Sequence, residues 1–335
     1  MSSLRPTLAD VARAAGVSSA TASMALNDRP GVRHETRLAV LAAARHLGYR
    51  RPGVGEALGR GLIGVLPTDL ANPYHTDVLA GIEEHAEREG LAVVIGHGRR
   101  DRVHLERQLR RLVDLGVDGV IAVTTWLSPA VLEAAARQLP VVVIGRMQDA
   151  VPGTDTVRND DEAGAALAVQ HLVERGHRDL VHVTMSSRPG PASRRAGFLA
   201  EAERLGLRDR VRVIGPDSPD EGMELVLRAL HRGDPGAATG VFAANDIAAV
   251  SVLHRAADRR VRVPEQLSVV GYDSSSVALT VRPHLTSVNQ PRSEMGRLAA
   301  QMIQERWRGR SHDSVCVVSP VLRVRGSTAV GPALR

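Results

Sequence analysis

Short apolar runs alternate with amphipathic stretches from Leu62 onward, and this alternation restricts the fold more than any other feature of the chain. Strands that are apolar along their whole length are buried on both faces, as in a parallel sheet with helices on each side. We therefore predict an α/β core built from doubly wound parallel sheets. The expected strands are 62–66, 91–95, 119–123, 141–144, 180–184, 211–214, 240–243 and 267–270.

The segments between these strands carry apolar residues at helical spacing. The expected helices are 78–89, 103–115, 161–175, 192–205 and 246–257. Because this number of strand–helix units exceeds one doubly wound sheet of usual size, we predict two lobes that divide near residue 158.

The first 47 residues carry the signals of short helices. Thr7 and Asp10 have the spacing of a capping box at the start of a helix that Gly16 ends. Ser18 can cap a second helix over 19–26, and a third is expected over 34–47. Two short helices joined by a tight turn are typical of a helix–turn–helix, whose second helix enters the major groove of DNA. An ordinary α-hairpin is the alternative.

The placement of charge favours the DNA-binding alternative. The 335 residues carry 43 basic and 37 acidic side chains, a formal net charge of +6, and every basic residue is arginine. Residues 1–60 contain nine arginines and four acids, so they hold nearly all of the excess positive charge. A basic segment on a near-neutral body is typical of a protein that binds a polyanion such as nucleic acid.

Other features exclude classes of protein. The single cysteine, Cys316, rules out a disulfide framework within the chain, and the 13 histidines show no metal-ligand spacing, so we expect no metal or cofactor. The glycines of 59–64 match G-x-G-x-x-G, but they precede a strand instead of following one, as a dinucleotide site requires. There is no G-x-S-x-G, P-loop or strand-end cysteine, so no enzyme is expected. Without a secretion signal or a long apolar run, the protein is expected to be soluble and cytoplasmic.

The N-terminal segment contains TLADVARAAGVSSATASMALNDRPGVRHETRLAVLAAARHLGYR, which resembles the DNA-binding headpiece of the lactose-repressor (LacI/GalR) family of bacterial transcription regulators. The resemblance continues through IGVLPTDLANPY, RRAGF, FAAND, VVGYD and LRVRGST, and covers about residues 7–328. It implies a repressor whose partners are double-stranded operator DNA and a sugar-like effector bound between two lobes resembling periplasmic binding proteins. The implied division is headpiece 1–49, hinge 50–61, N-lobe 62–158 with 290–317, and C-lobe 159–289 with 318–328.

The resemblance also assigns DNA contacts. The base-reading positions are Ser19 and Ala20, which are both small, and Met24 stands where the family often has an arginine able to bind guanine bidentately. Arginine contacts to phosphates and DNA deformation are therefore expected to supply more of the affinity. The expected DNA-binding residues are Thr7, Ser18, Ser19, Ala20, Thr21, Ser23, Met24, Asn27, Arg33, Arg37, Tyr49, Arg50, Arg51 and Leu58.

The hinge departs from the family pattern. The resemblance implies that residues 50–61 form a helix on the operator and that Leu58 wedges between base pairs in the minor groove. The family's usual Ala-Arg-Ser-Leu reads Gly55-Glu56-Ala57-Leu58 here, and each glycine of this segment disfavours a helix by about 1 kcal/mol relative to alanine. A plain flexible linker is the alternative.

Polar and aromatic residues follow the expected strands, where ligands bind in open α/β sheets. The family motifs single out Arg194, Asn245 and Asp273 as partners for sugar hydroxyls or a nucleobase. Tyr74 or Trp126 can stack on the apolar face of a sugar. Instead of binding an effector, Asn245 could cap the next helix and Trp126 could pack in the core. The expected effector-binding residues are Asp69, Asn72, Tyr74, His75, Trp126, Arg146, Arg194, Asn245 and Asp273.

The rival function is a sugar-binding protein of the periplasmic type without gene regulation. That class has the same two lobes but lacks a headpiece and carries a secretion signal, which is the reverse of this chain. A two-fold operator requires a two-fold protein, so we expect a homodimer. The eight residues after Ser327 contain Gly and Pro and predict no tetramerisation helix. Adjacent acids Asp160 and Asp161 are expected to cap a helix. The pattern leaves open whether the effector induces or co-represses.

Overall fold

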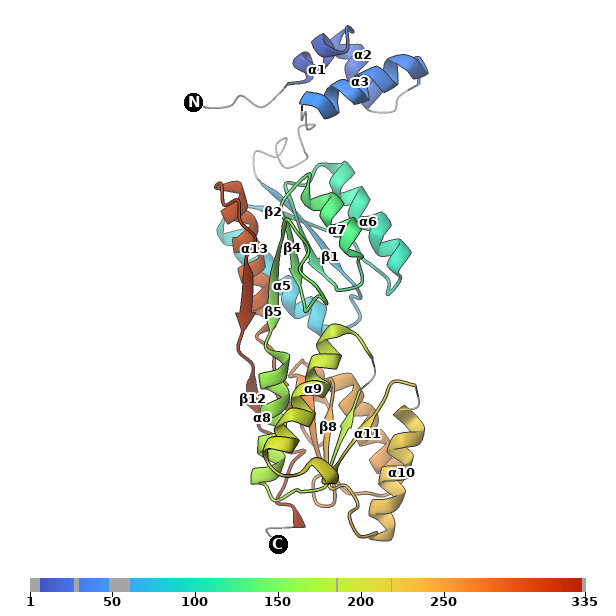
Figure 1. Ribbon diagram of the computed structural model, residues 1–335, viewed down its shortest axis with the longest axis vertical. Helices are drawn as coiled ribbons and strands as arrows, with labels where there is room; N and C mark the ends of the chain where they lie inside the picture. Colours follow the sequence, from blue (N-terminus) through green and yellow to red (C-terminus); the bar gives the residue numbers. More distant parts are fainter. Residues whose placement is uncertain (1–6, 27–29, 48–60, 185, 218, 333–335) are drawn as a thin grey trace.

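A computed structural model describes residues 7–26, 30–47, 61–184, 186–217 and 219–332 (Figure 1). Of the residues expected to act on DNA, five lie outside this part of the chain: Asn27, Tyr49, Arg50, Arg51 and Leu58. The segment 50–61 expected to form the hinge is described only at its last residue, Gly61.

Three helices form the N-terminal unit: α1 (Leu8–Ala14), α2 (Ser19–Leu26) and α3 (His34–Leu47). The capping box is present, since the backbone N–H of Thr7 donates to Asp10 Oδ2 at 2.8 Å and that of Asp10 donates to Thr7 Oγ1 at 3.3 Å. Gly16 has a φ of +67°, which places the turn between α1 and α2 in the left-handed region that glycine favours. Small side chains pack where the helices cross, namely Val11, Ala12, Ala22, Ala25, Val40 and Ala44. The predicted helix–turn–helix is confirmed.

The first sheet has the strand order β11-β5-β4-β3-β1-β2, and all of its pairs are parallel. Its strands are β1 (Leu62–Pro67), β2 (Ala92–Ile95), β3 (Gly119–Val123), β4 (Val141–Ile144), β5 (Thr154–Asn159) and β11 (Val315–Val318). Helices α5 (Pro73–Arg88) and α13 (Arg292–Trp307) cover one face. Helices α6 (Arg102–Leu115) and α7 (Pro129–Ala136) cover the other. We call this unit the N-lobe.

The second sheet, in the unit that we call the C-lobe, has the order β12-β10-β9-β8-β6-β7. Its strands are β6 (Leu180–Val183), β7 (Val211–Ile214), β8 (Gly240–Ala243), β9 (Ser268–Asp273), β10 (Thr286–Asn289) and β12 (Val321–Arg323). Helices α8 (Asp161–Glu174) and α9 (Pro189–Arg204) pack on one face, and α10 (Pro219–Arg232) and α11 (Asp246–Asp258) on the other. The short helices η1 (Arg208–Arg210) and α12 (Val277–Thr280) complete it.

Each expected strand is present, and most bounds agree within a residue. The pattern missed β5, β10, β11 and β12, together with helices α7, α10, α12 and α13. β12 also departs from the all-parallel expectation, because it runs antiparallel to β10. Among the described helices, none has the length and apolar composition needed to cross a bilayer.

Within the described core the chain passes between the lobes after β5, after β10 and between β11 and β12. The second passage leads directly into α13, which crosses α5 very closely. A Cβ atom at Gly81 would lie far closer to the Ser293 carbonyl oxygen than van der Waals contact allows, and one at Gly296 would meet the Val78 carbonyl in the same way. The two glycines therefore set the distance between α5 and α13.

Candidate DNA interface and effector cleft

The N-terminus of α2 presents small polar side chains. Ser18 caps α2, because its Oγ accepts the backbone N–H of Thr21 at 3.1 Å and lies 2.8 Å from Thr21 Oγ1. Ser19 and Ala20 are exposed, whereas Ser23 and Met24 are half-buried. The first turn of α2 is therefore accessible to a DNA groove, and its short side chains extend little beyond the helix backbone.

Further residues expected to contact DNA lie around this turn. Thr7 is exposed at the start of α1, where its hydroxyl is bonded to Asp10 at 2.7 Å. Arg33 directly precedes α3 and is exposed, and Arg37 lies one helical turn later and is half-buried. Because guanidinium groups stay charged at all ordinary pH values, this end of the headpiece keeps a positive charge.

On the N-lobe side of the cleft, two polar residues shape the loop that places two rings. Asp69 Oδ1 accepts the backbone N–H of Ala71 at 2.9 Å, and Asn72 Oδ1 caps α5 by accepting that of Tyr74 at 3.0 Å. The rings of Tyr74 and His75 then meet edge-on, with centroids 5.3 Å apart. Burial lowers the pKa of His75 to about 4, so its ring is neutral, and its buried Nδ1 has no hydrogen-bond partner. The loop thus offers one aromatic face and one uncharged imidazole.

On the C-lobe side, Arg194 is held on three sides. Its Nε donates to Asp161 Oδ1 at 2.9 Å, its Nη1 donates to the Ala244 carbonyl at 2.6 Å, and its guanidinium lies 3.9 Å from the centre of the Tyr272 ring. Burial alone would lower the pKa of Arg194, but Asp161, Tyr272 and Asp273 together outweigh burial and raise the pKa. Tyr272 in turn donates to Asp161 Oδ1 at 3.3 Å and accepts from Asn159 Nδ2 at 2.5 Å. The cation is therefore fixed in position and orientation.

Asp273 ends β9 as a buried carboxyl, 7% exposed, with a φ of +100°. The side-chain amide of Gln290 donates to its Oδ1 at 2.6 Å. Burial raises the pKa of Asp273 to about 7, against the opposing pull of Arg194. This carboxyl can therefore act either as an acceptor or, when protonated, as a donor near neutral pH.

Asn245 begins α11 as its N-cap, with its Oδ1 accepting the backbone N–H of Ala248 at 2.8 Å. The side-chain oxygen of Asn245 therefore caps the helix, as the alternative interpretation predicted. The cap does not use its amide nitrogen. The neighbouring Asp246 is buried and accepts bonds from Ser275 and Ser287, so it is committed to the C-lobe interior.

Arg146 and Arg188 each contact the opposite lobe. Arg146, after β4, lies 3.7 Å from Asp161 and 3.9 Å from Glu162 on α8. The Arg188 guanidinium lies 3.8 Å from the centre of the Trp126 ring, which also packs against the N-lobe core. Of the expected residues, Arg146 and Arg194 meet at Asp161, at the boundary between the lobes, and Asp273 lies near Arg194. Trp126 meets Arg188, which was not among the expected residues.

The expectation that Asp160 and Asp161 both cap α8 is wrong for Asp161. Asp160 Oδ1 does accept the backbone N–H of Ala163 at 3.1 Å. The Asp161 side chain is only 5% exposed and is paired with Arg194 and Arg146. A helix cap must face the free N–H groups at the helix end, and the second acid of the pair instead faces Arg194 and Arg146.

Sequence reasoning missed residues that complete the seam. They are Asn159, Asp161, Arg188, Tyr272, Gln290 and Arg292. Asn159 and Gln290 lie at the carboxyl ends of β5 and β10, strands that were not predicted, so their position carried no signal. Tyr272 does lie in an expected family motif, and its place beside Arg194 was open to inference.

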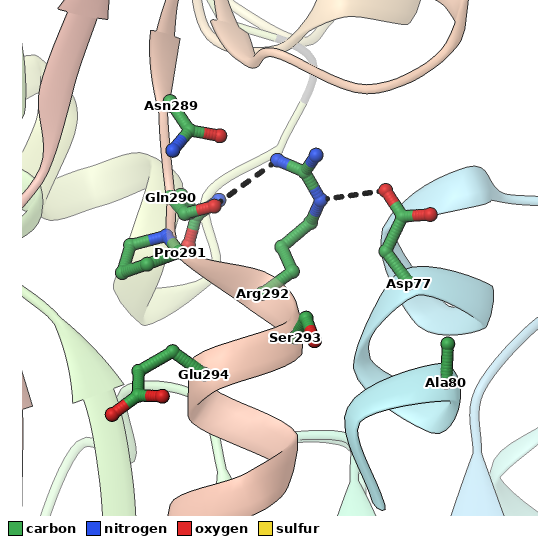
Figure 2. A pocket seen from close by; sticks show the side chains of 8 residues that line it. All are labelled: Asp77, Ala80, Asn289, Gln290, Pro291, Arg292, Ser293 and Glu294. Carbon is green, nitrogen blue, oxygen red and sulfur yellow. Dashed lines mark hydrogen bonds and ion pairs between the residues drawn. The ribbon is translucent and has the colours of Figure 1, made fainter. Parts of the chain in front are cut away.

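A hollow of about 490 Å³ lies along α5 and the second passage, and Figure 2 shows its lining side chains. They are Asp77, Ala80, Asn289, Gln290, Pro291, Arg292, Ser293 and Glu294. No cluster of three or more His, Cys, Asp or Glu side chains that could hold a metal ion occurs among the described residues.

Comparison with known proteins bears on both parts of the chain. Residues 7–52 match the model of bacterial regulatory proteins of the lacI family, and residues 169–328 match that of a periplasmic binding protein-like domain. The HTH-type transcriptional repressor PurR of Erwinia tasmaniensis is 31% identical over 335 residues, and the match covers 97% of this chain and 98% of PurR. The chain belongs to the LacI family of bacterial regulatory proteins.

Solved structures of the LacI family share the architecture. The regulator CelR in complex with cellobiose matches with a TM-score of 0.67 and 30% identity, covering 96% of this chain and all of CelR. The lac repressor dimer bound to operator and the anti-inducer ONPF matches with a TM-score of 0.70 and 26% identity, covering 97% of this chain and all of that one. This LacI-family chain is thus a DNA-binding transcriptional regulator with a core of the effector-binding type.

Proposed function

We propose that this LacI-family regulator represses transcription as a homodimer on a two-fold operator in the cytoplasm, without catalysis, and that an effector in the interlobe cleft changes its affinity for DNA. One observation carries the proposal: a helix–turn–helix with an open first turn of α2 and a polar seam between two lobes occur in one chain. The rival, a sugar-binding protein without gene regulation, has no use for the headpiece.

We assign DNA recognition to residues 1–49 and DNA bending to the hinge, 50–61. Ser19 and Ala20 are exposed at the turn that would face base edges, and Met24 offers no bidentate donor. Arg33, with the arginines at 37, 50 and 51, would bind phosphates. Leu58 would form the minor-groove wedge, where an apolar side chain unstacks a base step. The N-lobe (62–158 and 290–317) and C-lobe (159–289 and 318–328) would move relative to one another on effector binding.

For the effector we propose a small polar metabolite of the sugar class. Arg194 would donate to ring or hydroxyl oxygens, the Asn245 amide nitrogen would donate, and Asp273 would accept or donate according to its protonation. Tyr74 and Trp126 would cover apolar faces of the ligand. The bound cellobiose of CelR supports the class, since that relative matches over 96% of this chain.

The proposal is tested by selecting operators from a random DNA library with the full-length chain. The selected DNA is then titrated by fluorescence anisotropy with and without each compound of a panel of sugars, polyols and nucleobases. We expect a palindromic site and a compound that changes its affinity at least tenfold. A chain that selects no sequence but is stabilised by a sugar would be the non-regulatory binding protein.

Removal of one phosphate contact gives a sharp prediction for the headpiece. Arg33→Gln should weaken all DNA sequences alike, roughly fivefold to tenfold at 100 mM salt, because each phosphate contact contributes about 0.9 to the slope of log affinity against log salt. The slope should fall by about that amount in a salt titration. Arg111→Gln, an equal charge change at an exposed position of α6, should leave the slope unchanged. A changed sequence preference in Arg33→Gln would contradict the phosphate role.

The raised pKa of Asp273 predicts a pH-dependent stability. The folded chain holds this proton up to about pH 7, whereas an unfolded aspartate releases it near pH 4. The folded state therefore binds more protons, and the stability contributed by the group is complete below pH 4 and is lost as the pH rises to 7. Asp273→Asn keeps the bond from Gln290 and tolerates the positive φ, so it should be about 2 kcal/mol more stable relative to wild type at pH 8 than at pH 5.

The measurement is the denaturation midpoint of both chains between pH 5 and 8. The charged or titratable groups that interact with Asp273 are Arg194, Asp246, Arg292 and Tyr272, with Tyr74 from the N-lobe. Asp149→Asn, at an exposed position, serves as the control and should shift both ends of the range equally. Parallel curves for wild type and Asp273→Asn would show that Asp273 is ionised throughout.

A further inference from the structure

A buried arginine lies at the second passage between the lobes, where Figure 2 shows its bonds to Asp77 and Gln290. Arg292 is the first residue of α13, and its side chain is 9% exposed. Its Nε donates to Asp77 Oδ2 on α5 at 2.9 Å, and its Nη2 donates to the Ser274 carbonyl of the C-lobe at 3.0 Å. Its Nη1 donates to the Gln290 carbonyl at 3.2 Å. One guanidinium thus joins the N-lobe, the C-lobe and the passage.

Two of these three contacts lead directly to Asp273. Ser274 is the next residue, and both have positive φ angles, +100° for Asp273 and +50° for Ser274, so the turn has a specific and unusual backbone. Gln290, whose carbonyl Arg292 binds, donates its side-chain amide to Asp273 at 2.6 Å. A change in the position of Asp273 therefore alters two of the acceptors that orient Arg292.

The third contact leads to α5. Asp77 lies one turn after Tyr74, on the helix that crosses α13 at Gly81. Its carboxylate is 39% exposed, so water screens the ion pair and the pair contributes little to stability. The value of the pair is directional: a planar guanidinium fixes three acceptors at set angles, which the point charge of a lysine does not.

We propose that Arg292 is a positioning residue that links the effector carboxylate Asp273 to helix α5 through its forked contacts with Ser274, Gln290 and Asp77. The proposal rests on the proposed function for its use of Asp273 as an effector contact. When a ligand in the cleft draws Asp273 toward it, the turn at Ser274 carries Arg292 along. Arg292 then displaces Asp77 and with it the start of α5.

The test is hydrogen–deuterium exchange of the full-length chain with no effector present. The perturbation is Asp273→Ala, which removes the acceptor of the Gln290 amide. The readout is the exchange of α5 amides within residues 76–84, beyond Tyr74. We expect Asp273→Ala to change this exchange at least threefold in the wild-type background and less than 1.5-fold in the Asp77→Asn background. Arg292→Lys should abolish the response in the same way, because lysine keeps the charge but lacks the planar guanidinium that donates to three acceptors. Glu84→Gln, an exposed position on α5, should preserve it.

Each alternative outcome overturns the link. A purely structural Arg292 would give additive effects, so that the exchange response to Asp273→Ala persists in the Asp77→Asn background. The response would also persist in that background if Asp273 acted on α5 directly through Tyr74 and not through Arg292. A full response in Arg292→Lys would show that charge alone suffices. Because no effector is used, a failed effector search leaves this result standing, and additive exchange leaves the effector assignment untouched.

Discussion

Arg194→Ala is expected to abolish the effector response while the effector-free chain still binds its operator. The guanidinium donates to Asp161 and Ala244 and is oriented by the Tyr272 ring, so the variant removes a cation that is already ordered for binding. Hydrogen bonds to a charged donor contribute about 1.5–3 kcal/mol each. The loss of two such bonds should weaken effector affinity by about 100-fold or more. Titration of the operator complex with the effector measures both quantities.

The same change leaves Asp161 buried with the Tyr272 hydroxyl at 3.3 Å and with Arg146, at 3.7 Å, as its remaining cation. Removing one partner of a buried ion pair destabilises a protein by about 3–5 kcal/mol, so the denaturation midpoint should fall as well. Arg194→Lys separates the loss of stability from the loss of effector response, because it keeps the charge beside Asp161 but not the planar guanidinium. This variant should have nearly the stability of the wild type and little effector response. Arg195→Ala, exposed on the same helix, is the matched control. An undiminished response in Arg194→Ala would place the effector elsewhere.

The sequence predicted four neighbouring strands of each sheet and missed the two strands at one side, β5 and β11 in the N-lobe and β10 and β12 in the C-lobe. The central strands are runs such as Val141–Ile144, whose residues are all buried, and only an apolar segment satisfies that position. By contrast, β5 and β10 read Thr-Asp-Thr-Val-Arg-Asn and Thr-Ser-Val-Asn, and their polar side chains are paired inside the protein. Asp155, for example, is buried against Arg306 and Arg310. Such strands depend on distant partners, so periodicity does not reveal them.

The same reason explains which part of the cleft could be predicted. Strand ends follow from strand patterns, and the seam does gather Arg146, Arg194 and Asp273. The role of Asp161 depends on an arginine 33 residues later in the chain. An adjacent pair of acids before a helix looks like a cap from local pattern alone. Only the packing of α8 against α9 shows that the second acid turns inward.

Gly81→Ala is expected to lower stability by about 3 kcal/mol, at the upper end of the range for overpacked cores. The added methyl would overlap the backbone carbonyl of Ser293, and a backbone atom cannot rotate away as a side chain does. The helices α5 and α13 must therefore separate, and their shared apolar contacts with β1, including those of Ile82 and Met295, loosen. At roughly 2–4 °C per kcal/mol for a domain of this size, the denaturation midpoint should fall by about 6–12 °C.

The control for Gly81→Ala is Gly215→Ala, where a Cβ atom meets open space and φ lies outside the left-handed region. That variant should be neutral or slightly more stable, because alanine restricts the unfolded chain. Separation of α5 from α13 also moves Tyr74 and Asp77, so Gly81→Ala should weaken the effector response beyond what its lower stability explains. A midpoint within 1 °C of wild type would mean that the crossing yields easily. A crossing that yields could not transmit a small displacement at Arg292, so this result would also count against α5 as the element that the cleft controls.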